Sequence, residues 1–231
     1  MHIITPTTIE SVAWEGKLIA PSTVYAVRSS DRPVVTIGHP EIWPVAEALQ
    51  NQVGQKWVPP LGDADYWLVR LACTLRDPRG LSNITEAQQT LNLRPQNKNA
   101  GHAATYVFSL YPDRLTVESQ REFNVSLGPE LKFSGAELKL GEVGAKIEYR
   151  KVFPVIQSYG AGESEPYWIF QRHASHPLDG SQFVYAVVVA KGGAGSIRAA
   201  INLTVTVEGP FGLWRSSLSD EAKVHTRFTI P

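Results

Sequence analysis

The sequence is poor in cysteine and has no excess of either charge. Cys73 is the one cysteine, so no internal disulfide can form. It lies in the alternating stretch WLVRLACTL, where we expect a small buried hydrophobic side chain. The chain has 22 basic and 22 acidic side chains. Because phosphate backbones attract a basic excess, this balance predicts no nucleic-acid partner.

Long apolar runs are missing as well. The longest, FVYAVVVA at 183–190, is far shorter than the roughly 20 residues of a membrane-spanning helix. The start, MHIITPTTIE, has neither a basic nor an apolar segment, so we expect no secretory signal and a cytoplasmic, reducing location. Copies of a chain without net charge repel one another little, which promotes their association. This favours a protein partner or self-association, and contact with a membrane is not expected.

Period-two alternation dominates from about residue 64 onward, as in strands with one face on a core. FVYAVVVA is apolar on both sides, which is typical of a central strand covered on both faces. The chain is therefore predicted to be mainly β, an antiparallel two-layer β-sandwich with one short N-terminal helix. The apolar faces are Trp67, Val69, Leu71, Cys73 and Leu75; Tyr106, Phe108 and Leu110; Phe123, Val125 and Leu127; and Ile201, Leu203, Val205 and Val207.

Two short stretches predict specific local structures, a hairpin and a helix. The glycine-rich KGGAGS at 191–196 separates FVYAVVVA from INLTVTV, and predicts a hairpin that joins these two strands. In PEIWPVAEALQNQVG the apolar residues follow helical spacing. Because Pro44 is tolerated only in a first turn, this helix is predicted to begin near Pro40 or Glu41.

The domain organisation is predicted to be simple. TEAQQTLNL at 85–93 fits either a short helix or a strand, and we favour the strand, with Ala87, Leu91 and Leu93 on one side. We expect a single domain over 1–231, in which a mixed, proline-rich segment with the helix (1–63) precedes the sandwich (64–231). A boundary at 58–63 (VPPLGD) is the alternative.

Residues that carry acid–base or metal chemistry gather at 158–182, SYGAGESEPYWIFQRHASHPLDGSQ. Glu163 and Glu165 are two residues apart and, with His173, are candidates for acid–base catalysis. His173, His176 and Asp179 have the spacing of metal ligands on a helical turn, but Pro177 disfavours a helix there, so no metal or other cofactor is predicted. The glycines and prolines favour surface turns, with an active site as the second interpretation.

Aromatic residues near predicted strand ends are candidate binding residues. Tyr167 and Trp168 follow the glycine loop, and Trp214 follows the last long strand. Tyrosine and tryptophan stack on sugars or anchor partners, although they also plug the ends of a sandwich. No G-x-S-x-G element is present, and KGGAGS lacks the G-K-[ST] ending of a phosphate loop.

No motif of a known family can be placed on the chain. The sequence therefore predicts a non-catalytic β-sandwich module, soluble and intracellular, that acts as an accessory subunit and binds a protein partner or its own copies. Two alternatives stay open: a hydrolase with a site in the loops of 158–182, and a membrane- or glycan-binding β protein. INLTVTV alternates as in pore-forming hairpins, but FVYAVVVA would place apolar residues in the lumen.

Overall fold

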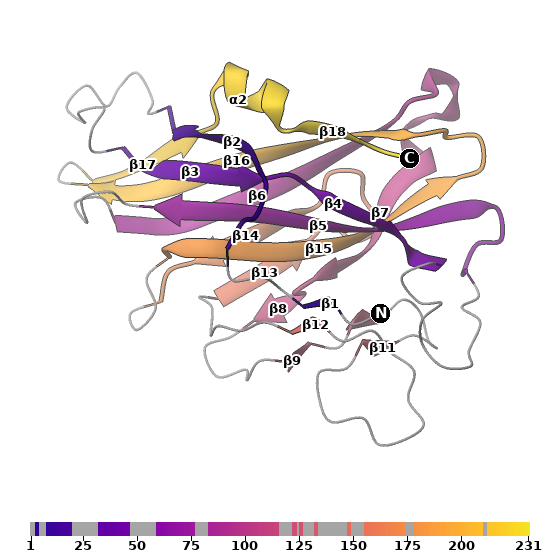
Figure 1. Cartoon of the computed structure of the whole chain (residues 1–231), viewed down its shortest axis with the longest axis horizontal. Helices are drawn as coiled ribbons and strands as arrows, with labels where there is room; N and C mark the ends of the chain where they lie inside the picture. The colour runs from indigo at the N-terminus through magenta and orange to yellow at the C-terminus, as the bar shows by residue number, and fades with distance from the viewer. Residues whose placement is uncertain are drawn as a thin grey trace.

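The protein is mainly β, and its strands form two large antiparallel sheets (Figure 1). No helix among the described residues is long and apolar enough to span a bilayer. The computed structural model describes residues 3–4, 8–19, 32–46, 59–76, 83–115, 122–123, 125–126, 132–133, 147–148, 155–173, 178–209 and 212–231.

The six-stranded sheet has the order β2-β3-β5-β15-β7, and β4 continues along the same edge of β5 as β3. Residues of the first 63 thus supply β2, β3 and β4 to a sheet that the later chain completes. The bounds are β2 (Val12–Lys17), β3 (Val34–Gly38), β4 (Glu41–Pro44), β5 (Ala64–Arg76), β7 (Thr105–Tyr111) and β15 (Gly180–Lys191).

The seven-stranded sheet has the order β17-β16-β6-β14-β13-β8, and β18 pairs with β16 beside β17. Its bounds are β6 (Asn83–Pro95), β8 (Arg114–Leu115), β13 (Val155–Tyr159), β14 (Tyr167–Gln171), β16 (Ile197–Gly209), β17 (Gly212–Ser217) and β18 (Arg227–Ile230). Smaller elements are β1 (Ile3–Ile4), β9 (Glu122–Phe123), β10 (Val125–Ser126), β11 (Lys132–Phe133), β12 (Ile147–Glu148), η2 (Lys98–Ala100), η3 (His102–Ala104) and α2 (Asp220–His225).

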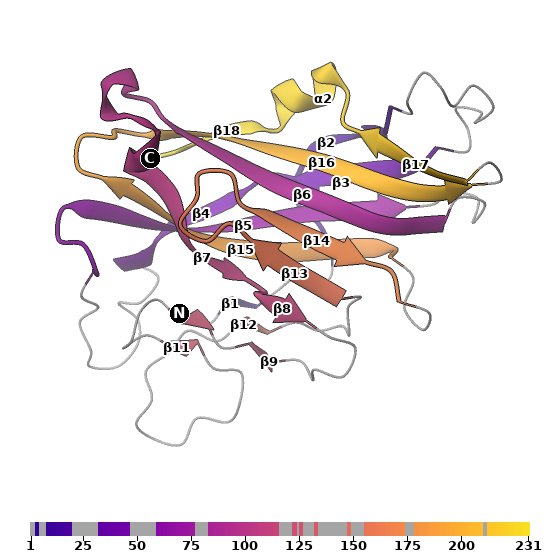
Figure 2. The same ribbon diagram turned by 180° about the vertical axis from the view of Figure 1, so that it is seen from behind.

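The two sheets lie one behind the other. The six-stranded sheet is in front in Figure 1, and the seven-stranded sheet is in front in the opposite view of Figure 2. One cluster of buried apolar side chains draws on both, with Leu71 and Val184 from one sheet and Leu91 and Leu203 from the other. Burial of this alternating face is the main apolar contribution to stability.

The strands that were predicted at 67–75, 183–190 and 85–93 are present. In β5, the predicted inner residues Val69, Leu71, Cys73 and Leu75 are fully buried, whereas Trp67, predicted on the same face, is half-buried. In β15, every residue from 182 to 190 is buried, and the strand pairs with β5 on one side and β7 on the other. The stretch 85–93 forms part of β6, so the preference for a strand is confirmed.

The predicted hairpin between β15 and β16 is wrong. β15 pairs with β5 and β7, whereas β16 pairs with β6, β17 and β18, so residues 192–196 cross from one sheet to the other. Gly193 and Gly195 have positive φ, as a sharp change of direction requires. The residues just after β6 stabilise the crossing segment, since Asn97 Nδ2 donates a hydrogen bond to Gly193 O at 2.8 Å. Glycine-rich turns specify a reversal, but not the strand that becomes the partner.

The predicted N-terminal helix is also wrong over its first residues. Glu41–Pro44 form strand β4, the next two residues, Val45 and Ala46, are helical, and the rest of the predicted helix, 47–54, lies outside the described residues. Pairing with β5 satisfies this segment better than a first helical turn that contains Pro44. Among the described elements the α-helix is α2, near the C-terminus, which Ser219 caps by accepting a hydrogen bond from Ala222 N.

β7 departs from simple alternation. A register shift lies opposite Val187 and Val188, where Phe108 is the extra residue of a β-bulge. The bulge places Val107 and Leu110 among the buried residues, while Tyr106 and Phe108 are half-buried. The predicted apolar face Tyr106–Phe108–Leu110 is therefore wrong, because one inserted residue changes the face of everything before it.

Candidate functional site

The segment 158–182 forms a hairpin and its flanks. β13 and β14 pair in antiparallel fashion, and residues 160–166 form the turn between them. Glu163 and Glu165 are exposed in this turn. Its backbone is tied to both sheets, since Val107 N donates to Glu163 O and Leu93 N donates to Ser164 O, each at 2.9 Å. The prediction of a surface turn is confirmed here.

The candidate catalytic residues do not converge. His173 follows the far end of β14, eight residues after Glu165, which is about 26 Å along an extended strand. Asp179 is exposed just before β15, and His176 lies outside the described residues. Within the described part of the chain, no three histidine, cysteine, aspartate or glutamate side chains are close enough to hold a metal ion. The hairpin therefore separates the groups that a hydrolytic site would need together.

The candidate aromatic residues divide into two groups. Trp168 is 0% exposed and Trp214 is 7% exposed, so these two candidate binding residues are core side chains. Tyr167 lies on the opposite side of β14 and stacks on Tyr159, with ring centroids 5.1 Å apart and an interplanar angle of 22°. Tyr159 is 42% exposed, which leaves one aromatic platform on the outside of the seven-stranded sheet.

Cys73 is not a nucleophile in this fold. It is fully buried in β5, and burial raises the pKa of its thiol to about 12. A thiol this deep stays protonated, as expected for a structural side chain.

Several basic side chains gather on the outer face of the seven-stranded sheet. We call it the basic groove, a hollow of about 660 Å³ that β6, β16, β18 and α2 line. Three arginines and a lysine surround it in a chain whose formal net charge is zero. Its lining residues are Asn92, Arg94, Arg198, Ala199, Ala200, Asn202, Lys223, Arg227, Phe228 and Thr229.

Strand register brings these side chains together. Arg198 of β16 lies directly opposite Arg94 of β6. Two residues further along, Ala200 lies between Asn92 of β6 and Arg227 of β18. Cross-strand partners share a face of the sheet, and buried Leu93, Ile197 and Ala199 alternate with them on the inner side.

The arginines of the groove have no acidic partner within the described part of the chain. Lys223 does have one, since its Nζ lies 2.9 Å from Asp220 Oδ1. Further along the same face, Arg172 lies 3.5 Å from Glu208. The basic groove therefore keeps the positive charge of Arg94, Arg198 and Arg227.

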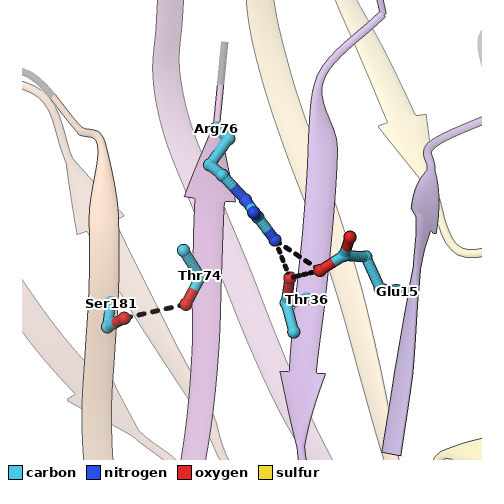
Figure 3. Close-up of polar contacts among 5 residues, drawn as sticks. All are labelled: Glu15, Thr36, Thr74, Arg76 and Ser181. Atoms are coloured by element: carbon cyan, nitrogen blue, oxygen red, sulfur yellow. Dashed lines mark hydrogen bonds and ion pairs between the residues drawn. The ribbon is translucent and has the colours of Figure 1, made fainter. Parts of the chain in front are cut away.

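The outer face of the six-stranded sheet is arranged differently. A polar row crosses it, from Glu15 and Thr36 to Thr74 and Ser181 (Figure 3). Thr36 Oγ1 donates to Glu15 Oε2 at 2.6 Å, and Arg76 binds both of these residues. Thr74 and Ser181 share a hydrogen bond of 2.8 Å. In this row every charge has a partner.

The sequence did not reveal the basic groove. Each of its arginines stands alone in its own strand, and the three strands are far apart in the chain. The one local hint is Ala200, a short residue on the polar face of IRAAINLTVTV. Register, which alternation does not supply, decides that Ala200 forms the floor between charged neighbours.

The fold defines a class, a mainly β protein with two large antiparallel sheets. No family model and no curated protein matches the chain. Three solved structures are similar to the chain over most of its length. Clostridium perfringens delta-toxin has 10% identity and a TM-score of 0.42, with 89% of this chain and 96% of that chain covered. A pore-forming protein has 8% identity and a TM-score of 0.37, with 85% and 89% covered. The membrane-inserted form of the Clostridium perfringens NetB toxin has 8% identity and a TM-score of 0.35, with 86% and 100% covered.

These matches correct the predicted biology. Their titles name a toxin, a pore-forming protein and a membrane-inserted form, which contradicts a soluble, cytoplasmic accessory module without membrane contact. At this identity and TM-score the likeness assigns no activity to the chain. Self-association remains a prediction. FVYAVVVA and INLTVTV do not form a hairpin in this structure, since the two strands belong to different sheets.

Proposed function

We propose that the chain is a membrane-binding β protein, a two-layer sandwich whose seven-stranded sheet turns the basic groove toward anionic lipid headgroups. The observation that carries this proposal is the set of three arginines without acidic partners on one outer face. Attraction to an anionic leaflet contributes about 1 kcal/mol per arginine near the surface. Three arginines then contribute about 3 kcal/mol, or roughly a hundredfold in affinity.

Vesicle flotation tests the proposal. The full chain is expected to float with vesicles that contain phosphatidylserine, less with pure phosphatidylcholine, and less again as salt screens the charges. The triple variant R94Q/R198Q/R227Q is expected to lose most of this binding. A double variant, R172Q/R215Q, is the control, because both residues lie on the same sheet but line a different hollow.

Two results would contradict the proposal. One is a chain that stays in solution with anionic vesicles at low salt, and the other is equal loss of binding in the triple variant and the control. Trapped dye in the same vesicles separates two modes of action, since release indicates a pore and retention indicates binding at the surface.

Glycan binding is the second candidate. The stacked pair Tyr159 and Tyr167 favours it, because aromatic faces on a polar sheet stack on sugar rings. Thr90, the cross-strand partner of Tyr167, continues the polar surface toward the basic groove. A glycan array that compares the full chain with Y159A distinguishes this candidate from membrane binding.

A further inference from the structure

We propose that the hollow above Ala200 is a discrete binding site for a phosphate group, supplied by a lipid headgroup or by free phosphate. The lipid source rests on the proposed membrane function, whereas the site itself does not. Diffuse attraction to a charged surface needs only net charge. A discrete site needs a short residue at its floor, a set of hydrogen-bond donors around it, and positive charge that no carboxylate neutralises. The basic groove has all three.

Ala200 provides the floor. Its methyl group lies between Asn92 and Arg227 across the two neighbouring strands. The next residues on the same face of β16 are Arg198 and Asn202, which both line the hollow. On the outward face of the sheet, the short side chain of Ala200 thus has longer polar side chains as its neighbours. A tetrahedral oxyanion held above Ala200 would meet donors on more than one side.

Two arginines create the demand for an anion. Arg94 and Arg198 are direct cross-strand partners, and like charges in this position repel each other. Neither has a carboxylate partner within the described residues, so nothing in that part of the chain offsets the repulsion. An anion bound between the two arginines would attract both of them and so offset their mutual repulsion. The planar guanidinium group matches the oxygens of a phosphate with two parallel hydrogen bonds, as a lysine does not.

Asn92 supplies a neutral donor. Its Nδ2 is excluded from solvent and has no hydrogen-bond partner among the described residues. Buried amide groups are normally satisfied, so an orphaned donor that lines a hollow points to a missing acceptor. A phosphate oxygen beside Asn92 would provide one.

The nearby acidic groups do not compete for this role. Asp220 is engaged by Lys223 through an ion pair of 2.9 Å at the wall formed by α2. Glu165 belongs to the turn whose carbonyls accept hydrogen bonds from β6, but it lines a separate hollow with Lys191. The groove therefore remains positive in its centre.

The test is a comparison of two single substitutions that change the net charge equally. Ala200→Asp places a carboxylate on the floor of the groove. Thr204→Asp, the control, places one on the same strand and face, outside the lining. Inorganic phosphate is titrated into the full chain by calorimetry and thermal shift, with chloride of equal ionic strength as the blank. Vesicles that contain phosphatidic acid are measured in parallel, and circular dichroism checks the fold.

The expected result is phosphate binding that A200D weakens about tenfold to hundredfold and T204D leaves within about threefold, since charge-assisted hydrogen bonds are lost only in the first. Phosphate binding without vesicle binding supports the site with free phosphate as its source, and overturns the membrane function alone. Vesicle binding that A200D and T204D weaken equally overturns the discrete site and leaves the membrane function standing. Absence of both kinds of binding overturns both proposals.

Discussion

The arginines of the basic groove differ from those on the outer face of the six-stranded sheet in whether an acidic side chain is their partner. On the six-stranded sheet, Arg70 binds Glu41 and lies over the Trp43 ring at 5.4 Å, while Arg76 binds Glu15 and Thr36. On the seven-stranded sheet, the groove arginines face one another and meet no carboxylate within the described residues. Arginine therefore stabilises the fold on the six-stranded sheet, whereas in the basic groove its charge can still bind a ligand.

Arg70 shows what the structural use involves. Its side chain is only 10% exposed, and burial by itself disfavours the charged guanidinium. The hydrogen bond and the charge of Glu41, together with Tyr185, more than offset this cost, so the pKa of Arg70 is raised above its usual value. A cation that is satisfied within the fold has little left to offer a ligand, whereas an exposed and unpaired cation has its full hydrogen-bonding capacity.

The largest effect is expected from breaking the pair on the six-stranded sheet. Glu41→Ala leaves the Arg70 charge buried without its carboxylate, and should lower the free energy of unfolding by about 2 kcal/mol. Urea denaturation measures this loss. Glu208→Ala is the matched control, since it removes an exposed carboxylate from Arg172 and should cost less than about 0.5 kcal/mol. Equal losses of the free energy of unfolding in the two variants would show that the Glu41–Arg70 pair stabilises the fold no more than the exposed Glu208–Arg172 pair.

A smaller effect is expected from pH. The Thr36 hydroxyl, and then Arg76, hold the pKa of Glu15 below its ordinary value of 4.5. The associated stability is full above pH 4.5 and is lost as the pH falls through the lowered pKa. Because Glu15 is half exposed, this contribution is at most about 0.5 kcal/mol. Unfolding measured from about pH 6 to about pH 3 should show wild type converging on E15Q, and a constant difference between them would contradict the assignment.

The smallest effect has the opposite sign and sharpens the comparison most. Arg198→Gln removes one member of the Arg94–Arg198 pair, and should stabilise the fold by a few tenths of a kcal/mol at low salt. High salt should abolish the gain, because screening already relieves the repulsion. Thermal unfolding at two salt concentrations measures it. If R198Q destabilises the protein, Arg198 has a structural partner and the contrast between the two faces disappears.

Much of the secondary structure was accessible from the sequence, but the candidate site was not. The polar turn at 160–166 was predicted correctly, and its carboxylates prove to be far from His173. The basic groove was missed because no short segment contains it. Arg94, Arg198 and Arg227 become neighbours only after three strands pair in one register.

The sequence by itself determined that β5 and β15 are strands, that β15 is buried on both faces, and that Cys73 is a core side chain. Side chains on a strand point alternately to opposite faces, so this information lies between adjacent residues. Tertiary structure alone decided that residues 192–196 cross between sheets, that a bulge turns β7, and that three lone arginines surround Ala200. Each of these depends on pairing between distant segments, whose free energy comes from contacts that no local pattern contains.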